Sequence, residues 1–372
     1  YFEIINLQFV SRKKEFFMQH QLDSKTHHSR QVLFSLLFIV VLVLGLLYAK
    51  WVPYFQKSFV AASTHNIGNA IVGNGHLGKA LPWFSLSLGW NFTKAYFLAI
   101  YKAFIVALLV GSLVQVLLPV RTIRKYMGGD KFSNSFWAML MGVPTMMCTC
   151  CTAPVAVGLK RSKASTRSVV SFFLANPLLN PATLIFMGFV LGWNYTIFRL
   201  IMGIIVVLLV SWFISKVAKE KMVNVPDNKM FDPIEYDDKS LFIRWLEALG
   251  KLMLESIPAY VVIVFILGCF QGLIFPAVAN LSNNPILGVI GLAILGTLFV
   301  IPTAGEIPII QTLLALGLAP VFVGTLIIAL PALSIVSLSL IKPAFSWKSV
   351  SYMFCAVVVM SIISGILGAI IL

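Results

Sequence analysis

The sequence predicts an all-α polytopic membrane protein with about seven full spans, two broken or re-entrant helical hairpins and inverted structural repeats. Three observations predict this fold class. Hydrophobic residues make up 59% of the 372 residues and charged residues only 11%, against ~25% charged residues in soluble domains. The mean hydropathy is +0.93, and several apolar runs approach the ~20 residues that span a bilayer. The two halves of the chain also resemble each other at a fixed spacing.

The charge balance fits the same class. Lys and Arg number 28 and Asp and Glu number 13, for a formal net charge of +15. A soluble protein this basic would suggest nucleic acid, but membrane proteins carry their excess Lys and Arg in cytoplasmic loops. We therefore expect the lipid bilayer as a partner and no nucleic acid. We also expect a multi-pass protein of the inner (plasma) membrane with a cytoplasmic N-terminus.

The predicted spans follow from the apolar runs. Residues 52–94 are rich in Gly, Ser, Asn and Trp, and we interpret them as an extramembrane or interfacial loop. Residues 216–251 hold seven Lys and Arg and most of the acids, so they divide the chain in two. The predicted spans are 31–48, 95–120, 168–193, 195–215, 252–275, 321–341 and 350–372. The resulting units are a cytoplasmic segment 1–30, a first helix and loop 31–94, a first repeat 95–215, a charged linker 216–251 and a second repeat 252–372.

Two further pieces, 132–159 and 286–318, each place Pro and small residues between two short apolar runs. A broken backbone at membrane depth is tolerated only when it is buried in protein or lines a cavity. Each piece is therefore predicted to be a helical hairpin or broken helix with its tip inside the membrane.

The internal repeat appears when the chain is displaced by 154 residues. Gly142 then meets Gly296, and two pairs of prolines also coincide at this spacing. If the basic segments lie on the cytoplasmic side, the first hairpin enters the membrane from the cytoplasm and the second hairpin enters it from outside. This inverted arrangement is typical of secondary transporters; the alternative is an old duplication kept only for packing. The matched proline pair at the hairpins is Pro154 with Pro308, and the pair in the following span is Pro177 with Pro331.

Three cysteines, Cys148, Cys150 and Cys151, lie at the centre of the first hairpin. Thiolates select soft partners such as Cu(I), Zn and thiophilic metalloids. Because neighbouring residues of a regular helix do not share a face, we expect a non-helical turn if Cys150 and Cys151 are to act together. The alternative is that buried Cys is a small apolar filler. The spacing Cys148-x-x-Cys151 also matches a redox motif, although the sequence gives it no helix-opening context.

Glu306 is the one acid after Glu255, and it occupies the repeat position of Thr152. An ionisable group inside a membrane is a functional candidate by default, so Glu306 is our candidate for proton coupling. The alternative is a carboxylate anchored at the start of the following helix. The further substrate-binding candidates are polar or helix-breaking residues near the two hairpins: Thr152, Pro154, Asn176, Asn180, Thr303 and Gln311.

The sequence lacks the signature motifs of several other functions. There is no phosphate-binding loop, no metalloprotease His pair and no nucleotide-binding Gly motif in the sequence. We therefore predict no catalytic residues, no resident metal and no cofactor, with a proton gradient as the energy source. The expected partner is a small-molecule substrate, and the sequence also allows a homo-oligomer.

Two runs of the first repeat, residues 148–159 and 171–181, resemble the predicted-permease family UPF0718 (YraQ-like), as does the run 305–311. This family contains the organoarsenical efflux permeases, and the resemblance covers residues 95–372. It implies arsenic resistance by secondary-active efflux of trivalent organoarsenicals such as methylarsenite. It further implies that Cys148 and Cys150 ligate arsenic. Family members usually carry Gly where this chain has Cys151, which here adds a third thiol.

Three alternatives stay open beside the organoarsenical permease. The chain could transport another small sulfur-containing or anionic solute. It could be a membrane thiol oxidoreductase that uses Cys148 and Cys151. It could also be a non-transporting subunit of a larger complex.

Overall fold

The computed structural model describes residues 36–65, 82, 84–117, 126–218, 241–270, 285–315 and 317–372. These residues are almost entirely helical and form no strand. Within these described residues, seven helices are long and apolar enough to cross a membrane, which confirms the predicted all-α class and the predicted number of spans.

The first half begins with a helix over Leu36–Thr64. This helix contains a π-helical turn, η1 (Leu47–Trp51), and continues as α2 (Val52–Thr64). The other helices of this half are α3 (Leu86–Leu117), α5 (Phe132–Gly142), η2 (Val143–Thr145), α6 (Thr149–Arg161), α7 (Thr166–Leu178), α8 (Pro181–Val190) and α9 (Trp193–Val217).

The second half has a matching set of helices. They are α10 (Leu241–Cys269), α12 (Pro285–Leu298), α13 (Glu306–Ala315), α14 (Pro320–Ala332), α15 (Ile335–Ile341), η3 (Lys342–Ala344) and α16 (Trp347–Ile371). The bounds of α14 are those of α7 displaced by 154 residues, and the bounds of α16 are those of α9 displaced by the same number. The spacing found in the sequence therefore also relates the helix boundaries.

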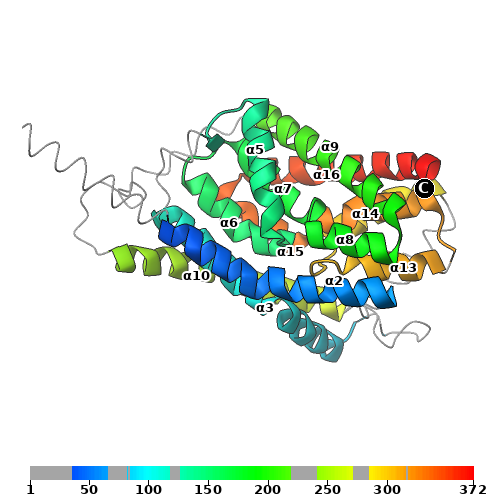
Figure 1. Ribbon diagram of the computed structural model, residues 1–372, viewed down its shortest axis with the longest axis horizontal. Helices are drawn as coiled ribbons and strands as arrows, with labels where there is room; N and C mark the ends of the chain where they lie inside the picture. The colour runs from blue at the N-terminus through cyan, green and yellow to red at the C-terminus, as the bar shows by residue number, and fades with distance from the viewer. Residues whose placement is uncertain are drawn as a thin grey trace, which may run out of the picture.

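The elements of both halves pack into one bundle (Figure 1). Helix α3 packs along α10, α7 along α9, and α14 along α16. Helix α6 of the first half contacts α15 of the second, and α13 contacts α8. Each hairpin therefore contacts a helix of the other half, and the two hairpin tips lie in the interior of the bundle.

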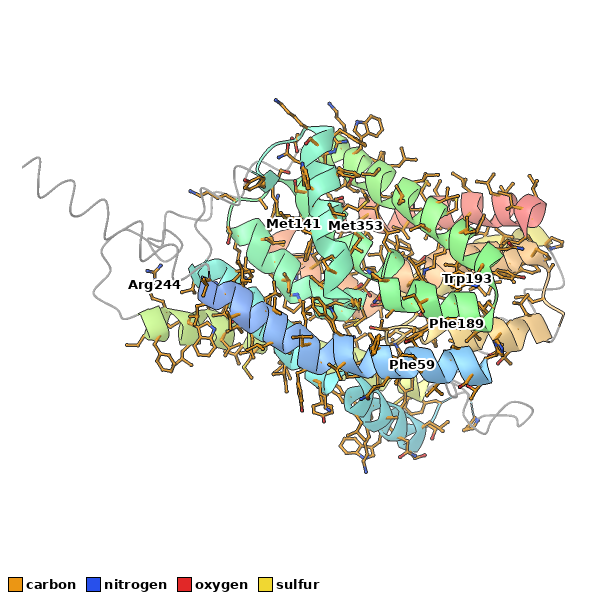
Figure 2. All side chains as sticks on the ribbon, viewed as in Figure 1. Phe59, Met141, Phe189, Trp193, Arg244 and Met353 are labelled. Carbon is orange, nitrogen blue, oxygen red and sulfur yellow. The ribbon has the colours of Figure 1, made fainter. Side chains whose placement is uncertain are left out.

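Large apolar side chains cover the outside of the bundle, as Figure 2 shows. At the turn between α8 and α9, the rings of Phe189 and Trp193 meet edge to face at 5.8 Å between centroids (Figure 2). Trp193 is 54% exposed, whereas Met353 on α16 is fully buried. An apolar exterior around a packed interior is the pattern expected of a multi-pass membrane protein.

The segment expected to be a loop begins with a helix instead. Residues 52–64 continue the first span as α2, and α3 already begins at Leu86, so the loop interpretation of 52–94 is wrong at both ends. Proline disturbs most helices, since its ring clashes with the carbonyl four residues earlier, and α2 carries Pro53 near its start. Here the widened π-turn precedes it, with the Val52 N–H bonded to the Leu47 carbonyl. Residues 66–81 and 83 lie outside the described residues.

The charged linker is also shorter than expected. Helix α10 begins at Leu241, eleven residues before the predicted start of its span. The charges of 241–251 led us to assign these residues to the linker, but a helix end can carry Lys and Arg side chains that extend toward the interface. Residues 219–240 lie outside the described residues.

Candidate functional site

The thiols of Cys148 and Cys151 meet at the start of α6. Cys148 is the N-cap of this helix, with extended backbone, and Cys151 lies in its first turn. The two sulfur atoms are 2.9 Å apart, and both cysteines are buried. Thr152 fixes the turn, because its backbone N–H and its hydroxyl both donate to the Cys148 carbonyl. Residues three apart on a helix are neighbours, so the helix itself brings these two thiols together.

The Cys150 thiol contacts a residue of the second half. Its sulfur lies 3.4 Å from the hydroxyl of Ser334, which caps α15 in the second half. Cys150 and Cys151 both lie in the first turn of α6, so the non-helical turn that joint action of these two neighbours would need is not present. Cys148 therefore lies beside both of the other thiols, while Cys150 also contacts the other half. Among the described residues, no group of three or more His, Cys, Asp and Glu side chains is arranged to hold a metal ion.

The redox motif does have the helix-opening context that the sequence did not reveal. Helix α6 starts at Thr149, one residue after Cys148. The run of Thr, Cys and Ala before Pro154 gave no sign of a helix there, because Pro154 suggested a break. The structure instead keeps Pro154 inside α6.

Pro154 removes one helical hydrogen bond beside the thiols. A proline cannot donate to the carbonyl four residues earlier, so the Cys150 carbonyl loses its helical partner. Helix α3 approaches closely here, because a Cβ on Gly111 would lie 2.8 Å from the Pro154 oxygen. The first turns of α6 are thus pressed against a glycine of α3.

This close approach predicts a specific instability. In Gly111→Ala the new methyl group would meet backbone atoms of Pro154, which cannot move without displacing α6. Overpacking of this kind costs ~1–3 kcal/mol, so we expect a lower unfolding midpoint by fluorescence-detected thermal unfolding. Gly250→Ala on α10 is the matched control, since nothing lies within 4 Å of its added Cβ. An equal or higher midpoint for Gly111→Ala would contradict this account of the contact.

The second hairpin places Glu306 at the first position of α13. Its carboxylate is buried, at 3% exposure, and accepts a 2.8 Å hydrogen bond from a guanidinium nitrogen (Nη1) of Arg199 on α9. Arg199 is fully buried. This ion pair joins the second hairpin to the helices of the first half.

Arg199 also binds the broken end of α7. Its Nε donates to the Leu178 carbonyl at 3.1 Å, and its Nη2 donates to the Pro177 carbonyl at 2.8 Å. Pro181 cannot donate to Pro177, and the Ala182 N–H donates to the side chain of Asn180 instead. Arg199 therefore satisfies the two carbonyls that this break leaves without helical partners.

The two asparagines of the same segment hold the backbone. Asn176 donates to the Phe172 carbonyl and accepts from the hydroxyl of Thr145. Asn180 caps α8 by accepting from the N–H groups of Ala182 and Thr183. The side-chain nitrogen of Asn180 is buried and has no hydrogen-bond partner in the described part of the chain, so one donor stays available at the break.

Lys50 is the third buried charge of the site. Its side chain is 6% exposed and donates to Thr303 at the second hairpin and to Tyr54, both at 3.0 Å. Its ammonium group lies within electrostatic range of the Cys148 and Cys151 thiols. Lys50 belongs to the π-turn η1, and such turns are frequent at functional sites. The first span therefore connects the two hairpin tips.

The predicted residues thus fall into three groups. Cys148, Cys151 and Thr303 are near Lys50, and Asn180 lies with Glu306 around the α7 break and Arg199. Gln311 lies farther along α13, where its amide nitrogen is 3.4 Å from the carbonyl of His65 at the end of the first span. Sequence reasoning missed Arg199 and Lys50. The available signal was a lone basic residue within or directly after an apolar run.

The comparisons agree with this architecture. A family model described as a predicted permease (ArsP_1) matches residues 85–370. The UPF0718 protein YraQ of Escherichia coli K12 is 38% identical over 333 residues, which cover 88% of this chain and 93% of the relative. No solved structure matches the chain. The chain therefore belongs to the UPF0718 family of predicted permeases, as its resemblance indicated.

Proposed function

We propose that the protein is a secondary-active permease of the inner membrane that exports a small thiophilic solute in exchange for protons. A trivalent organoarsenical such as methylarsenite is the proposed solute. The observation that carries the proposal is the buried pair of thiols, 2.9 Å apart, at the junction of the two hairpins. Soft thiol ligands suit As(III) better than they suit hard ions.

The ligation step balances without an oxidant. Methylarsenite in its neutral form carries two hydroxyl groups on arsenic. The sulfurs of Cys148 and Cys151 each form one As–S bond, both As–O bonds break, and the two thiol protons leave with the hydroxyls as two water molecules. The step is reversible by water, so the solute can be released without a reductant. The Cys150 thiol contacts the hydroxyl of Ser334 at the start of α15. A movement of α15 against α6 would therefore change this contact.

Glu306 and Arg199 supply the coupling in this proposal. Protonation of Glu306 removes its charge and weakens the bond to Arg199, which then keeps only the carbonyls of the α7 break. The hairpin tip that carries Glu306 thereby loses its ion pair to α9. The buried Arg199–Glu306 pair can be either formed or broken, which gives two conformational states. Solute binding and protonation can both shift the equilibrium between two such states. The matching helix boundaries of the two halves, with the inverted orientation that the charge pattern predicts, support alternating access around this centre.

Everted membrane vesicles test the proposal. We expect respiring vesicles with the wild-type protein to accumulate methylarsenite, and we expect Cys148→Ser and Cys151→Ser each to reduce the initial rate at least tenfold. Cys355→Ser on α16 is the matched control, because Cys355 is an exposed cysteine remote in sequence from the hairpins. Absence of accumulation by folded wild-type protein would remove methylarsenite as the solute, while the family assignment would remain.

One observation favours the oxidoreductase alternative as a second candidate. A Cys-x-x-Cys pair with its first cysteine at a helix N-terminus is the usual arrangement of thiol–disulfide catalysts, and α6 begins at this pair. Such a protein would pass two electrons and two protons from the Cys148–Cys151 dithiol to a quinone or a partner disulfide. A Cys148–Cys151 disulfide that forms and is reduced during turnover, detected by mass spectrometry after rapid alkylation, would favour this function over transport.

A further inference from the structure

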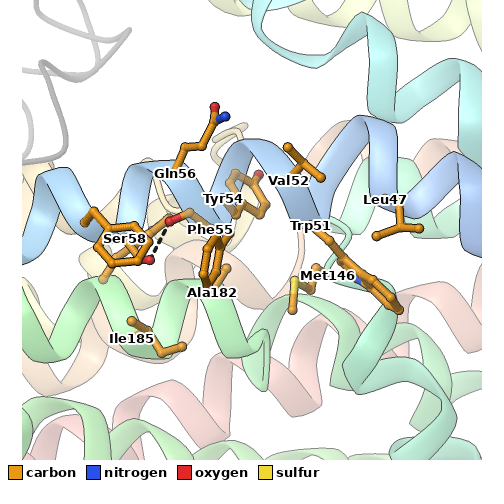
Figure 3. A pocket seen from close by; sticks show the side chains of 12 residues that line it. Leu47, Trp51, Val52, Tyr54, Phe55, Gln56, Ser58, Met146, Ala182 and Ile185 are labelled. Atoms are coloured by element: carbon orange, nitrogen blue, oxygen red, sulfur yellow. Dashed lines mark hydrogen bonds between the residues drawn. The ribbon is translucent and has the colours of Figure 1, made fainter.

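A groove of about 560 Å³ runs along the first span. Figure 3 shows its two walls, the π-turn and α2 on one side and the start of α8 with Met146 on the other. Its lining includes the aromatic side chains of Trp51, Tyr54 and Phe55. Its volume is within the ~300–1,000 Å³ typical of small-molecule sites. The outer lining residue Phe55 is 67% exposed, so the groove opens to the exterior of the bundle.

The groove ends beside a buried cation. Tyr54 lines it, and the Tyr54 hydroxyl accepts the hydrogen bond from Lys50 Nζ at 3.0 Å. The ammonium also lies 4.9 Å from the centre of the Tyr54 ring. Among the described residues, the Tyr54 hydroxyl hydrogen has no acceptor and Lys50 has no carboxylate within ion-pair distance. The hydroxyl can therefore donate into the groove, strengthened by the bond that it accepts.

A buried cation without a carboxylate partner is costly, and a bound anion relieves that cost. The apolar groove and the polar inner end together call for a ligand with an apolar part and one negative charge. The position of Lys50 along the first span favours a small ligand over a phospholipid headgroup. Lys50 lies fourteen residues from each end of the described helix Leu36–Thr64, or ~21 Å at 1.5 Å per residue. A headgroup sits at the surface of a ~30 Å hydrocarbon core, so a helix of this length centred on the bilayer would hold Lys50 away from the headgroups.

We propose that this groove binds a small amphipathic organic anion, with its apolar part against Trp51 and Phe55 and its charge held by Tyr54 and Lys50. The proposal rests on the proposed permease function, because it adds an anionic group to the solute class that the permease carries. Lys50 also binds Thr303 and lies near the thiols, so the anion reaches the same centre from the bilayer side. Lys50 and Trp51 lie before residue 85, where the match to the family model begins.

Trp51 provides a local reporter for the test. The probe is 4-bromobenzenesulfonate, a permanently anionic heavy-atom quencher, added to the purified protein in nanodiscs of phosphatidylcholine. We expect a saturable quenching component that Trp51→Phe removes. Lys50→Gln should weaken binding at least tenfold and Tyr54→Phe at least threefold, while Lys50→Arg should retain it. Lys102→Gln is the matched control, because Lys102 is an exposed lysine on α3 whose ammonium lies over the ring of Tyr48 of the same first span.

Any of three results would overturn the inference. The first is equal binding by Lys50→Gln, and the second is equal quenching by the neutral 4-bromobenzenesulfonamide. The third is quenching of Trp51 by lipids with brominated acyl chains that the sulfonate does not displace. This result would identify a lipid as the occupant. The assay needs neither arsenic nor a gradient. If the sulfonate fails to bind but the arsenical is still transported, only this subsite is overturned. If the sulfonate binds but the arsenical is not transported, only the proposed solute is overturned.

Discussion

Arg199→Met is expected to destabilise the protein by ~3–5 kcal/mol, the usual cost of removing one partner of a buried ion pair. The substitution leaves the buried Glu306 carboxylate without its partner, and it leaves the carbonyls of Pro177 and Leu178 without their donors. Thermal unfolding of the purified protein, followed by size-exclusion chromatography of the surviving fraction, measures the loss.

A double-mutant cycle separates the ion pair from the carbonyl bonds. We expect Glu306→Gln to cost less than Arg199→Met, because the amide oxygen can still accept from Arg199, whose bonds to the α7 break remain. The double variant Arg199→Met with Glu306→Met should recover part of the loss, since no buried charge is then left alone. Strict additivity of the two losses would contradict a direct interaction between these side chains.

The second large effect concerns coupling. We expect Glu306→Gln to reduce gradient-driven solute accumulation about 100-fold, because a neutral side chain can neither take up a proton nor release Arg199 in response to one. Downhill exchange of labelled for unlabelled solute should persist, since the thiols are untouched. This split between driven and exchange transport distinguishes a coupling role from a folding defect.

Glu247→Gln on α10 is the control for the coupling experiment. Glu247 lies in a helix of the same half but outside the two hairpins, and it is not among the residues that we place at the site. It should retain both driven accumulation and exchange. Full driven accumulation by Glu306→Gln would overturn the coupling role, and loss of both modes would reassign Glu306 to structure.

The sequence was most informative where local chemistry decides the structure. Pro181 cannot donate to Pro177, and Asn180 is a favoured cap, so the break in the α7–α8 span could be predicted from the residues alone. The same holds for the two hairpins, where Pro and small residues interrupt apolar runs. The 154-residue repeat was visible because Gly and Pro matches are rare in apolar sequence, and the helix bounds repeat at the same spacing.

Contacts between distant segments were beyond the sequence. Glu306 was recognised as an unusual buried acid, but its partner lies 107 residues earlier in the chain, and Arg199 looked like one basic residue in an otherwise apolar span. Lys50 was interpreted as the end of the first span. Its place between Thr303 and the thiols depends on a π-turn, which no composition or period indicates. The arrangement of the three thiols depends on where α6 begins, and Pro154 concealed that start.

The central claim is that solute ligation by the Cys148–Cys151 pair is coupled to proton movement through the same protein. Purified protein in liposomes loaded with a pH-sensitive dye tests it most directly. We predict that an imposed methylarsenite gradient drives proton flux in the opposite direction in the wild type. We predict no such flux in Cys148→Ser with Cys151→Ser, while Cys355→Ser behaves as the wild type. Equal proton flux in the double serine variant, or none with folded wild-type protein, would contradict the claim.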